Sequence, residues 1–184
     1  IRTTLLLSAV ALATFSTNAF ATPKKGTKTN RNTKARIETG MRTITEDAAR
    51  AHVYFLADDL LEGRRAGERG SRIAKRYIES RIREIGLKPL LGDSYEQPFE
   101  ACGVQRLKRS PRFYVNADSI AKIKKGVYQS LALSNVLAML PGRKSDEYVV
   151  VGAHLDHEGQ YADVAGDGIY NGADDNASGV SAVL

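Results

Sequence analysis

The sequence predicts an α/β domain whose sheet begins antiparallel or mixed. Two segments with helical spacing of apolar residues come first, within residues 43–86. Closely spaced strand-like segments follow between residues 95 and 151. The chain then runs through a long Gly- and Asp-rich segment into a helix near its last residue, Leu184. Helices followed by strands, and a strand–loop–helix unit at the end, are together typical of this fold class.

The first residues have the features of a secretory signal peptide. Arg2 precedes an apolar stretch at residues 5–13 that is too short to span a bilayer, and Ala-Phe-Ala at residues 19–21 fits a cleavage site. We therefore expect residues 1–21 to be a signal peptide, and the mature protein to be secreted or periplasmic without stable membrane insertion. A buried helix or a membrane anchor is the alternative interpretation. Because the chain begins with Ile1, we also expect further residues before it.

Residues 22–40 form a basic segment that we expect to be a disordered linker. The part from residue 22 to residue 36 holds six Lys or Arg and no Asp or Glu. With so few apolar side chains, it cannot bury enough surface to offset the entropy of ordering. The segment could contact anionic surfaces. No aromatic side chain lies between the charges to stack on bases, so we expect no nucleic-acid partner.

The folded domain is expected to span residues 41–184 and to open with a helix. Thr43 and Glu46 have the spacing of a capping box, in which each side chain satisfies an amide at the helix start. Apolar residues then recur at helical spacing as far as Leu60. Cys102 is the only cysteine, so no disulfide can form within the chain.

A Gly- and Arg-rich segment at residues 61–70 separates the first helix from a second one. It lacks the spacing and the ending of a phosphate-binding P-loop, so we expect a solvated loop. Ser71 is a good N-cap for the second helix. Gly86 is expected to end that helix in a left-handed conformation, followed by the hydrophobic contact of Leu87.

Strand-like patterns recur between residues 95 and 151. The expected elements are strands at residues 95–107, 113–115, 134–140 and 148–151, with a short helix at 119–125. Pro98 favours an edge or the start of a strand, because it cannot donate a ladder hydrogen bond. The β-branched run at 148–151 fits a strand buried on both faces. The short turn after Leu140 favours antiparallel pairing between the last two strands.

Side chains capable of metal chemistry follow that last strand. His154 and Asp156 come directly after it, and Asp174 and Asp175 lie further along in the Gly-rich segment. In open α/β sheets, ligands bind outside the carboxyl ends of the strands. Imidazole nitrogen together with carboxylate oxygens suits zinc. Composition alone leaves open whether these residues bind a metal or belong to an ordinary turn-rich loop.

Two motifs resemble the co-catalytic zinc aminopeptidases of metallopeptidase family M28. They are VGAHLDH at residues 151–157 and NGADDNASG at residues 171–179. Earlier segments are similar to the family as well, at residues 56–64, 85–87, 95–99 and 135–137. The resemblance therefore covers about residues 45–184.

The resemblance implies a mixed β-sheet between helices, with two zinc ions at the carboxyl edge of the sheet. By motif position, His154 would bind one zinc, Asp156 would serve catalysis by steadying that imidazole, and Asp175 would bridge both ions. A cis peptide bond would follow Asp175, whereas Asp174 and His157 would not be ligands. The implied function is an exported exopeptidase that hydrolyses the N-terminal bonds of peptide substrates through a water activated by two zinc ions.

Family members carry further groups beyond the position of Leu184. These are a Glu-Glu pair, whose first Glu is the general base, and then an Asp and a final His. We therefore expect this chain to be the N-terminal portion of a longer protein, truncated after the first metal-ligand loops and inactive alone. Two alternatives remain open, a non-catalytic binding relative on the same fold and a glutaminyl-cyclase-like transferase. The sequence carries no prediction of oligomeric state.

Overall fold

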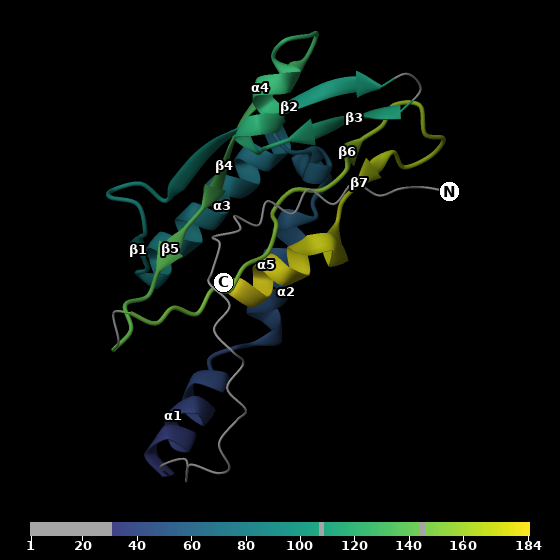
Figure 1. Ribbon diagram of the computed structural model, residues 1–184. Coiled ribbons are helices and arrows are strands. Elements are labelled where there is room, and N and C mark those ends of the chain that lie inside the picture. The colour runs from purple at the N-terminus through teal and green to yellow at the C-terminus, as the bar shows by residue number, and fades with distance from the viewer. Residues whose placement is uncertain (1–30, 107–108, 144–145) are drawn as a thin grey trace, which may run out of the picture. The chain divides into compact units, whose positions relative to one another are not determined.

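The computed structural model describes residues 31–106, 109–143 and 146–184 (Figure 1). The predicted signal peptide at residues 1–21 and the beginning of the predicted linker lie outside these residues. The chain divides into two units, Ile1–Ala49 and Arg50–Leu184, which are described separately. Within the described ranges, no helix is both long and apolar enough to cross a membrane.

The first unit contains helix α1 (Arg31–Met41), whose residues 31–40 belong to the segment expected to be a disordered linker. Its side chains from Thr33 onward are exposed, and Lys34 and Glu38 form an i,i+4 ion pair at 4.0 Å. Lys, Arg, Ala and Glu favour a helix locally without burial. The expectation that residues 22–40 form a disordered linker stays a prediction.

Helix α2 (Glu46–Leu56) begins at a different cap from the predicted one. The Oγ1 atom of Thr45 accepts a hydrogen bond from the Ala48 amide at 3.2 Å. Thr43 instead donates its hydroxyl to the Gly40 carbonyl at 2.7 Å, so the predicted Thr43 capping box is wrong. Both threonines have suitable chemistry, and the turn at the end of α1 decides which of them is free to cap α2.

In the second unit, the short helix η1 (Asp59–Arg64) leads into α3 (Arg69–Ile85). Helix α3 begins two residues before Ser71, the predicted N-cap. It ends as predicted, because Gly86 has a φ of 84° and donates its amide to the Arg83 carbonyl at 3.1 Å. This left-handed cap is accessible to glycine at little cost, which explains why the sequence predicts it well.

A three-stranded antiparallel sheet, ordered β3-β2-β4, follows α3 (Figure 1). Its strands are β2 (Glu96–Arg106), β3 (Arg109–Tyr114) and β4 (Gln129–Val136), and helix α4 (Ala117–Ile123) lies between β3 and β4 in sequence. Pro98 lies near the start of the central strand β2, opposite Ser134 of β4. Because β3 pairs with β2 only from Cys102 onward, Pro98 has a neighbouring strand on one side only.

Two further antiparallel pairs complete the strands of the described residues. Strand β1 (Lys88–Pro89) pairs with β5 (Ala138–Met139), and β6 (Gly159–Gln160) pairs with β7 (Ile169–Tyr170). The predicted strand at residues 134–140 is therefore divided between β4 and β5. The chain combines helices and sheets as expected, but in the described ranges the sheets are small and antiparallel.

The apolar run at residues 148–151 is not a strand in the structure. Its four side chains are 77%, 91%, 91% and 69% exposed, and the paired strands of the described residues do not include it. A β-branched run becomes a buried strand only where neighbouring strands pair with its backbone and other layers cover its faces. Those neighbours are not supplied by the residues that the structure describes. The prediction of a strand at residues 148–151, and of its antiparallel pairing with residues 134–140, is therefore wrong.

The core of the second unit joins its early helices to the C-terminal turn. Helix α5 (Ser178–Val183) follows the π-helical turn η2 (Ala173–Ala177). The buried core comprises Leu56, Leu61, Ala74, Ile78, Ile82, Tyr95, Ala177 and Val180. Ala153 and Leu155 pack against its edge. Apolar burial thus holds the segment around residue 154 and the turn around residue 175 on the same core.

Candidate metal centre

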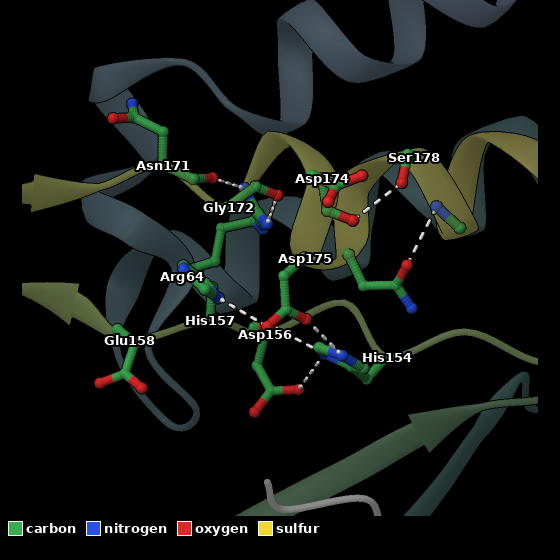
Figure 2. A network of polar contacts seen from close by, with 12 residues as sticks. Arg64, His154, Asp156, His157, Glu158, Asn171, Gly172, Asp174, Asp175 and Ser178 are labelled. Atoms are coloured by element: carbon green, nitrogen blue, oxygen red, sulfur yellow. Dashed lines mark hydrogen bonds and ion pairs between the residues drawn. The ribbon is translucent and has the colours of Figure 1, made fainter. Parts of the chain in front are cut away.

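The three candidate site residues lie together, although residues 148–153 directly before His154 do not form a strand. His154 and Asp156 are in an irregular segment, and Asp175 is in η2. The Nε2 atom of His154 is 2.9 Å from Oδ1 of Asp175, and its Nδ1 atom is 3.7 Å from Oδ1 of Asp156 (Figure 2). The imidazole ring therefore lies between the two carboxylates, with one ring nitrogen directed at each.

The contacts of the imidazole indicate where a cation would bind. Its Nδ1 atom is 3.0 Å from the main-chain oxygen of Asp156, which can only accept a hydrogen bond. If Nδ1–H donates to that oxygen, neutral His154 directs the lone pair of Nε2 toward the Asp175 carboxylate. Two electron-rich atoms 2.9 Å apart repel one another unless a positive charge lies close to both of them. A proton on Nε2 or a metal ion beside both atoms would supply that charge.

Asp156 contacts the ring more closely through its main chain than through its carboxylate. The main-chain oxygen is at 3.0 Å and the nearer carboxylate oxygen is at 3.7 Å. Burial raises the pKa of the Asp156 carboxyl above its usual range. A backbone hydrogen bond and the neighbouring His154, Arg64 and His157 act in the opposite direction on this pKa. Both kinds of contact orient the imidazole, as outer groups do at metal-bound histidines.

The turn that carries Asp175 depends on a glycine and on short polar contacts. Gly172 has a φ of 61°, and a Cβ atom there would lie 2.5 Å from the Asp175 carbonyl oxygen and 2.6 Å from Cγ of His157. Asn176 accepts a hydrogen bond from the Gly179 amide at 3.1 Å, which ties the turn to α5. The Asp175–Asn176 peptide is cis, as the family resemblance implies.

Two neighbouring residues, Asp174 and His157, were not expected to be ligands. Their contacts differ from those between His154 and Asp175. The side chain of Asp174 lies on the far side of the turn from His154 (Figure 2). The Nδ1 atom of His157 is 3.9 Å from Oδ2 of Asp175, and its main-chain amide donates to the Arg64 carbonyl at 3.2 Å. His157 therefore borders the site through the second carboxylate oxygen of Asp175.

Arg64 is the residue of this region that the sequence analysis missed. It belongs to the segment predicted to be a solvated loop, yet it is 1% exposed. Its guanidinium donates to the main-chain oxygens of Leu155 at 2.8 Å, Asn171 at 2.5 Å and Gly172 at 2.9 Å, and also to that of Leu56. Burial lowers its pKa, while the carboxylates of Asp156 and Asp175 act to raise it.

The prediction of a solvated loop is wrong because its basis was charge and glycine content. These features are typical of surface loops, but an arginine that satisfies several buried carbonyls is equally compatible with them. The available signal was the similarity of residues 56–64 to the family, since that similarity includes Arg64.

The donor types at the centre fit zinc, which binds imidazole nitrogen and carboxylate oxygen. The donors that converge are His154 and Asp175. Across residues 31–106, 109–143 and 146–184, no three His, Cys, Asp or Glu side chains form a group that could hold a metal ion. Zinc sites in proteins use three or four protein ligands. The described residues therefore fit part of such a site.

Residues 135–184 match Peptidase family M28. The resemblance to M28 is confirmed. The matching segment contains both motifs and all three candidate site residues, so a peptidase-related function of the metallopeptidase kind is indicated. M28 peptidases are generally zinc-dependent. No curated protein and no solved structure gives a significant match to the chain.

Proposed function

We propose that this protein is an exported, zinc-dependent aminopeptidase that hydrolyses the N-terminal peptide bonds of peptides. The observation that carries the proposal is the approach of His154 Nε2 to Asp175 Oδ1 within the segment that matches M28. An imidazole nitrogen and a carboxylate oxygen at 2.9 Å form the beginning of a cation site. Export is proposed from the signal-peptide pattern of residues 1–21.

In this proposal, His154 and Asp175 would hold the metal. The chemistry that zinc would supply there is a lowered pKa of a water molecule and polarisation of the substrate carbonyl. Asp175 directs one carboxylate oxygen to His154 and the other toward His157, at 3.9 Å from its Nδ1 atom. A carboxylate with its two oxygens directed to different places can serve two ions, which is the bridging role that the family resemblance implies.

The other residues of the centre orient these two ligands. The main-chain oxygen of Asp156 accepts a hydrogen bond from Nδ1–H of His154. This contact selects the tautomer whose Nε2 atom can bind a metal. Gly172 permits the tight turn that brings Asp175 to the imidazole. The general base and the remaining ligands are not assigned to the described residues.

The test is hydrolysis of an aminoacyl anilide by the protein as its gene encodes it, after chelation and after zinc is restored. The wild-type protein should lose activity with the chelator and regain it with zinc. His154→Ala should remain inactive in both states, because it lacks a ligand. His52→Gln is the matched control, since His52 lies in α2, where its Nδ1 atom is 2.8 Å from the Tyr77 hydroxyl.

Full activity of His154→Ala would refute the proposal. Zinc binding by the wild-type protein without hydrolysis would favour the non-catalytic binding relative. Release of ammonia from a peptide with an N-terminal glutamine, without anilide hydrolysis, would favour the cyclase-like transferase.

A further inference from the structure

One buried guanidinium connects the two segments that supply the candidate metal centre (Figure 2). Arg64 Nε donates at 2.8 Å to the carbonyl of Leu155, the residue between His154 and Asp156. Its two terminal nitrogens donate to Asn171 at 2.5 Å and to Gly172 at 2.9 Å, where the turn to Asp175 begins. The same side chain is therefore bonded next to both metal-ligand candidates.

The chemistry of arginine suits this connection. Its guanidinium is planar and charged, and it presents five N–H donors in a fixed fork. Here the fork serves four carbonyl oxygens, those of Leu56, Leu155, Asn171 and Gly172. Because the group is rigid, the positions of its acceptors relative to one another are restricted. A lysine has its three donors on a single atom and cannot span the same acceptors.

The backbone around Arg64 is adapted to bring the guanidinium to this place. Glu62, Gly63 and Arg64 have φ values of 52°, 65° and 50°, all in the left-handed region that residues other than glycine rarely adopt. The Arg64 carbonyl accepts the His157 amide at 3.2 Å. The backbone and the side chain of Arg64 therefore both bond to the segment that follows His154.

We infer that Arg64 is a positioning residue of the metal centre, whose guanidinium sets the separation between His154 and Asp175 by holding the backbone next to each. The inference rests on the proposed function, because it assigns Arg64 to the same site. It goes beyond that function by placing a determinant of the site's metal affinity in η1, about 90 residues before His154 in the sequence.

Hydrogen exchange measured without metal tests the positional part of the inference. Arg64→Lys and Arg64→Gln should speed exchange at the bonded amides of His157 and Ala177, while β2 and β4 keep the wild-type rates. Arg72→Lys is the matched control, because the exposed Arg72 donates to a single carbonyl, that of Gly67 at 2.7 Å. The control should exchange as the wild type does.

Binding of Co²⁺ in place of zinc, followed by its visible absorption spectrum, tests the effect on the metal centre. The experiment uses the protein as its gene encodes it. Arg64→Gln should bind Co²⁺ about 10–100-fold more weakly than the wild type, which is the usual effect of removing a group that orients metal ligands. Arg64→Lys should lie between the two, and Arg72→Lys should match the wild type.

Faster hydrogen exchange confined to the amides of His157 and Ala177, together with weakened Co²⁺ binding, would support the inference. Unchanged Co²⁺ affinity in both Arg64 variants would overturn it. Faster exchange that extends equally to β2 and β4, including complete loss of structure, would also overturn it, because Arg64 would then stabilise the whole unit and not the site.

A wild-type protein that binds no Co²⁺ would refute the proposed function separately. The exchange experiment would then decide on Arg64 alone. Opening confined to the segments around His157 and Ala177 would support its positioning of the backbone, and uniform opening or no change would overturn it.

Discussion

Replacing Gly63 by alanine should destabilise the second unit by more than the cost of the left-handed backbone conformation alone. Gly63 has a φ of 65°, and a Cβ atom there would lie 2.4 Å from the Gly159 carbonyl oxygen and 2.6 Å from that of Tyr170. These two oxygens belong to β6 and β7, which are paired with each other. Neither can therefore move away without disturbing the hydrogen-bonded pair.

The magnitude follows from two contributions, the net cost of the backbone conformation and the cost of the close contact. Holding an alanine in the left-handed region costs about 1–2 kcal/mol. The reduced entropy of the unfolded chain returns about 0.4–1 kcal/mol of this. Forcing backbone apart at a close contact adds about 1–3 kcal/mol. Gly63→Ala should therefore lower the free energy of unfolding by about 1–4 kcal/mol.

Gly86→Ala separates the two contributions experimentally. Gly86 has a φ of 84°, and a Cβ atom there would meet nothing within 4 Å. This variant should lose only about 1 kcal/mol, from conformation alone. Urea unfolding of both variants and the wild type, followed by far-UV circular dichroism, measures the difference. Equal losses in the two variants would refute the close packing of η1 against β6 and β7.

Two further predictions concern carboxylates. Hydrogen bonds from Lys75 at 2.6 Å and Ser134 at 2.7 Å hold the pKa of Glu96 at about 2, below its ordinary 4.5. Because the pKa is depressed, ionised Glu96 stabilises the fold above pH 4.5, and this stabilisation is lost as the pH falls toward 2. Solvent screening limits the stabilisation to about 1–2 kcal/mol. Unfolding of the wild type and of Glu96→Gln should therefore converge in stability over this window, and a constant difference between them would contradict the assignment. At the metal centre, Asp175→Asn should remove both proposed zinc ions together, because a bridging carboxylate serves both. Metal analysis of the purified protein measures this, and a variant that keeps one ion would show that Asp175 does not bridge.

The parts of the structure that were predicted well depend on neighbours in sequence. The left-handed end of α3 at Gly86 requires only the local backbone and a hydrophobic contact after it. The candidate metal residues were found because their motifs resemble those of a family, and the structure brings His154 to 2.9 Å from Asp175. The start and one-sided pairing of β2 at Pro98 likewise follow from the chemistry of a single residue.

The parts that were predicted wrongly depend on residues far along the chain. The run at residues 148–151 has the composition of a buried strand, but burial requires pairing partners that composition does not report. The segment that contains Arg64 has the composition of a surface loop. The carbonyl oxygens that accept from its guanidinium, however, are 8, 91, 107 and 108 residues away in the sequence. A helix cap can also be misplaced locally, as at Thr43 and Thr45, when a preceding turn engages one of two equivalent side chains.

The long separation between Arg64 and its carbonyl partners has a consequence during synthesis. A ribosome adds about 5–20 residues per second, so Gly172 is made roughly 5–20 s after Arg64. In that interval, β2, β3 and β4 have their pairing partners, whereas the core around α3 still lacks Ala177 and Val180. The guanidinium of Arg64 does not yet have the carbonyls of residues 155, 171 and 172. The nascent chain therefore brings His154 to Asp175 only after residues 171–175 have been made, and a protein interrupted before residue 171 carries a paired sheet without the candidate site.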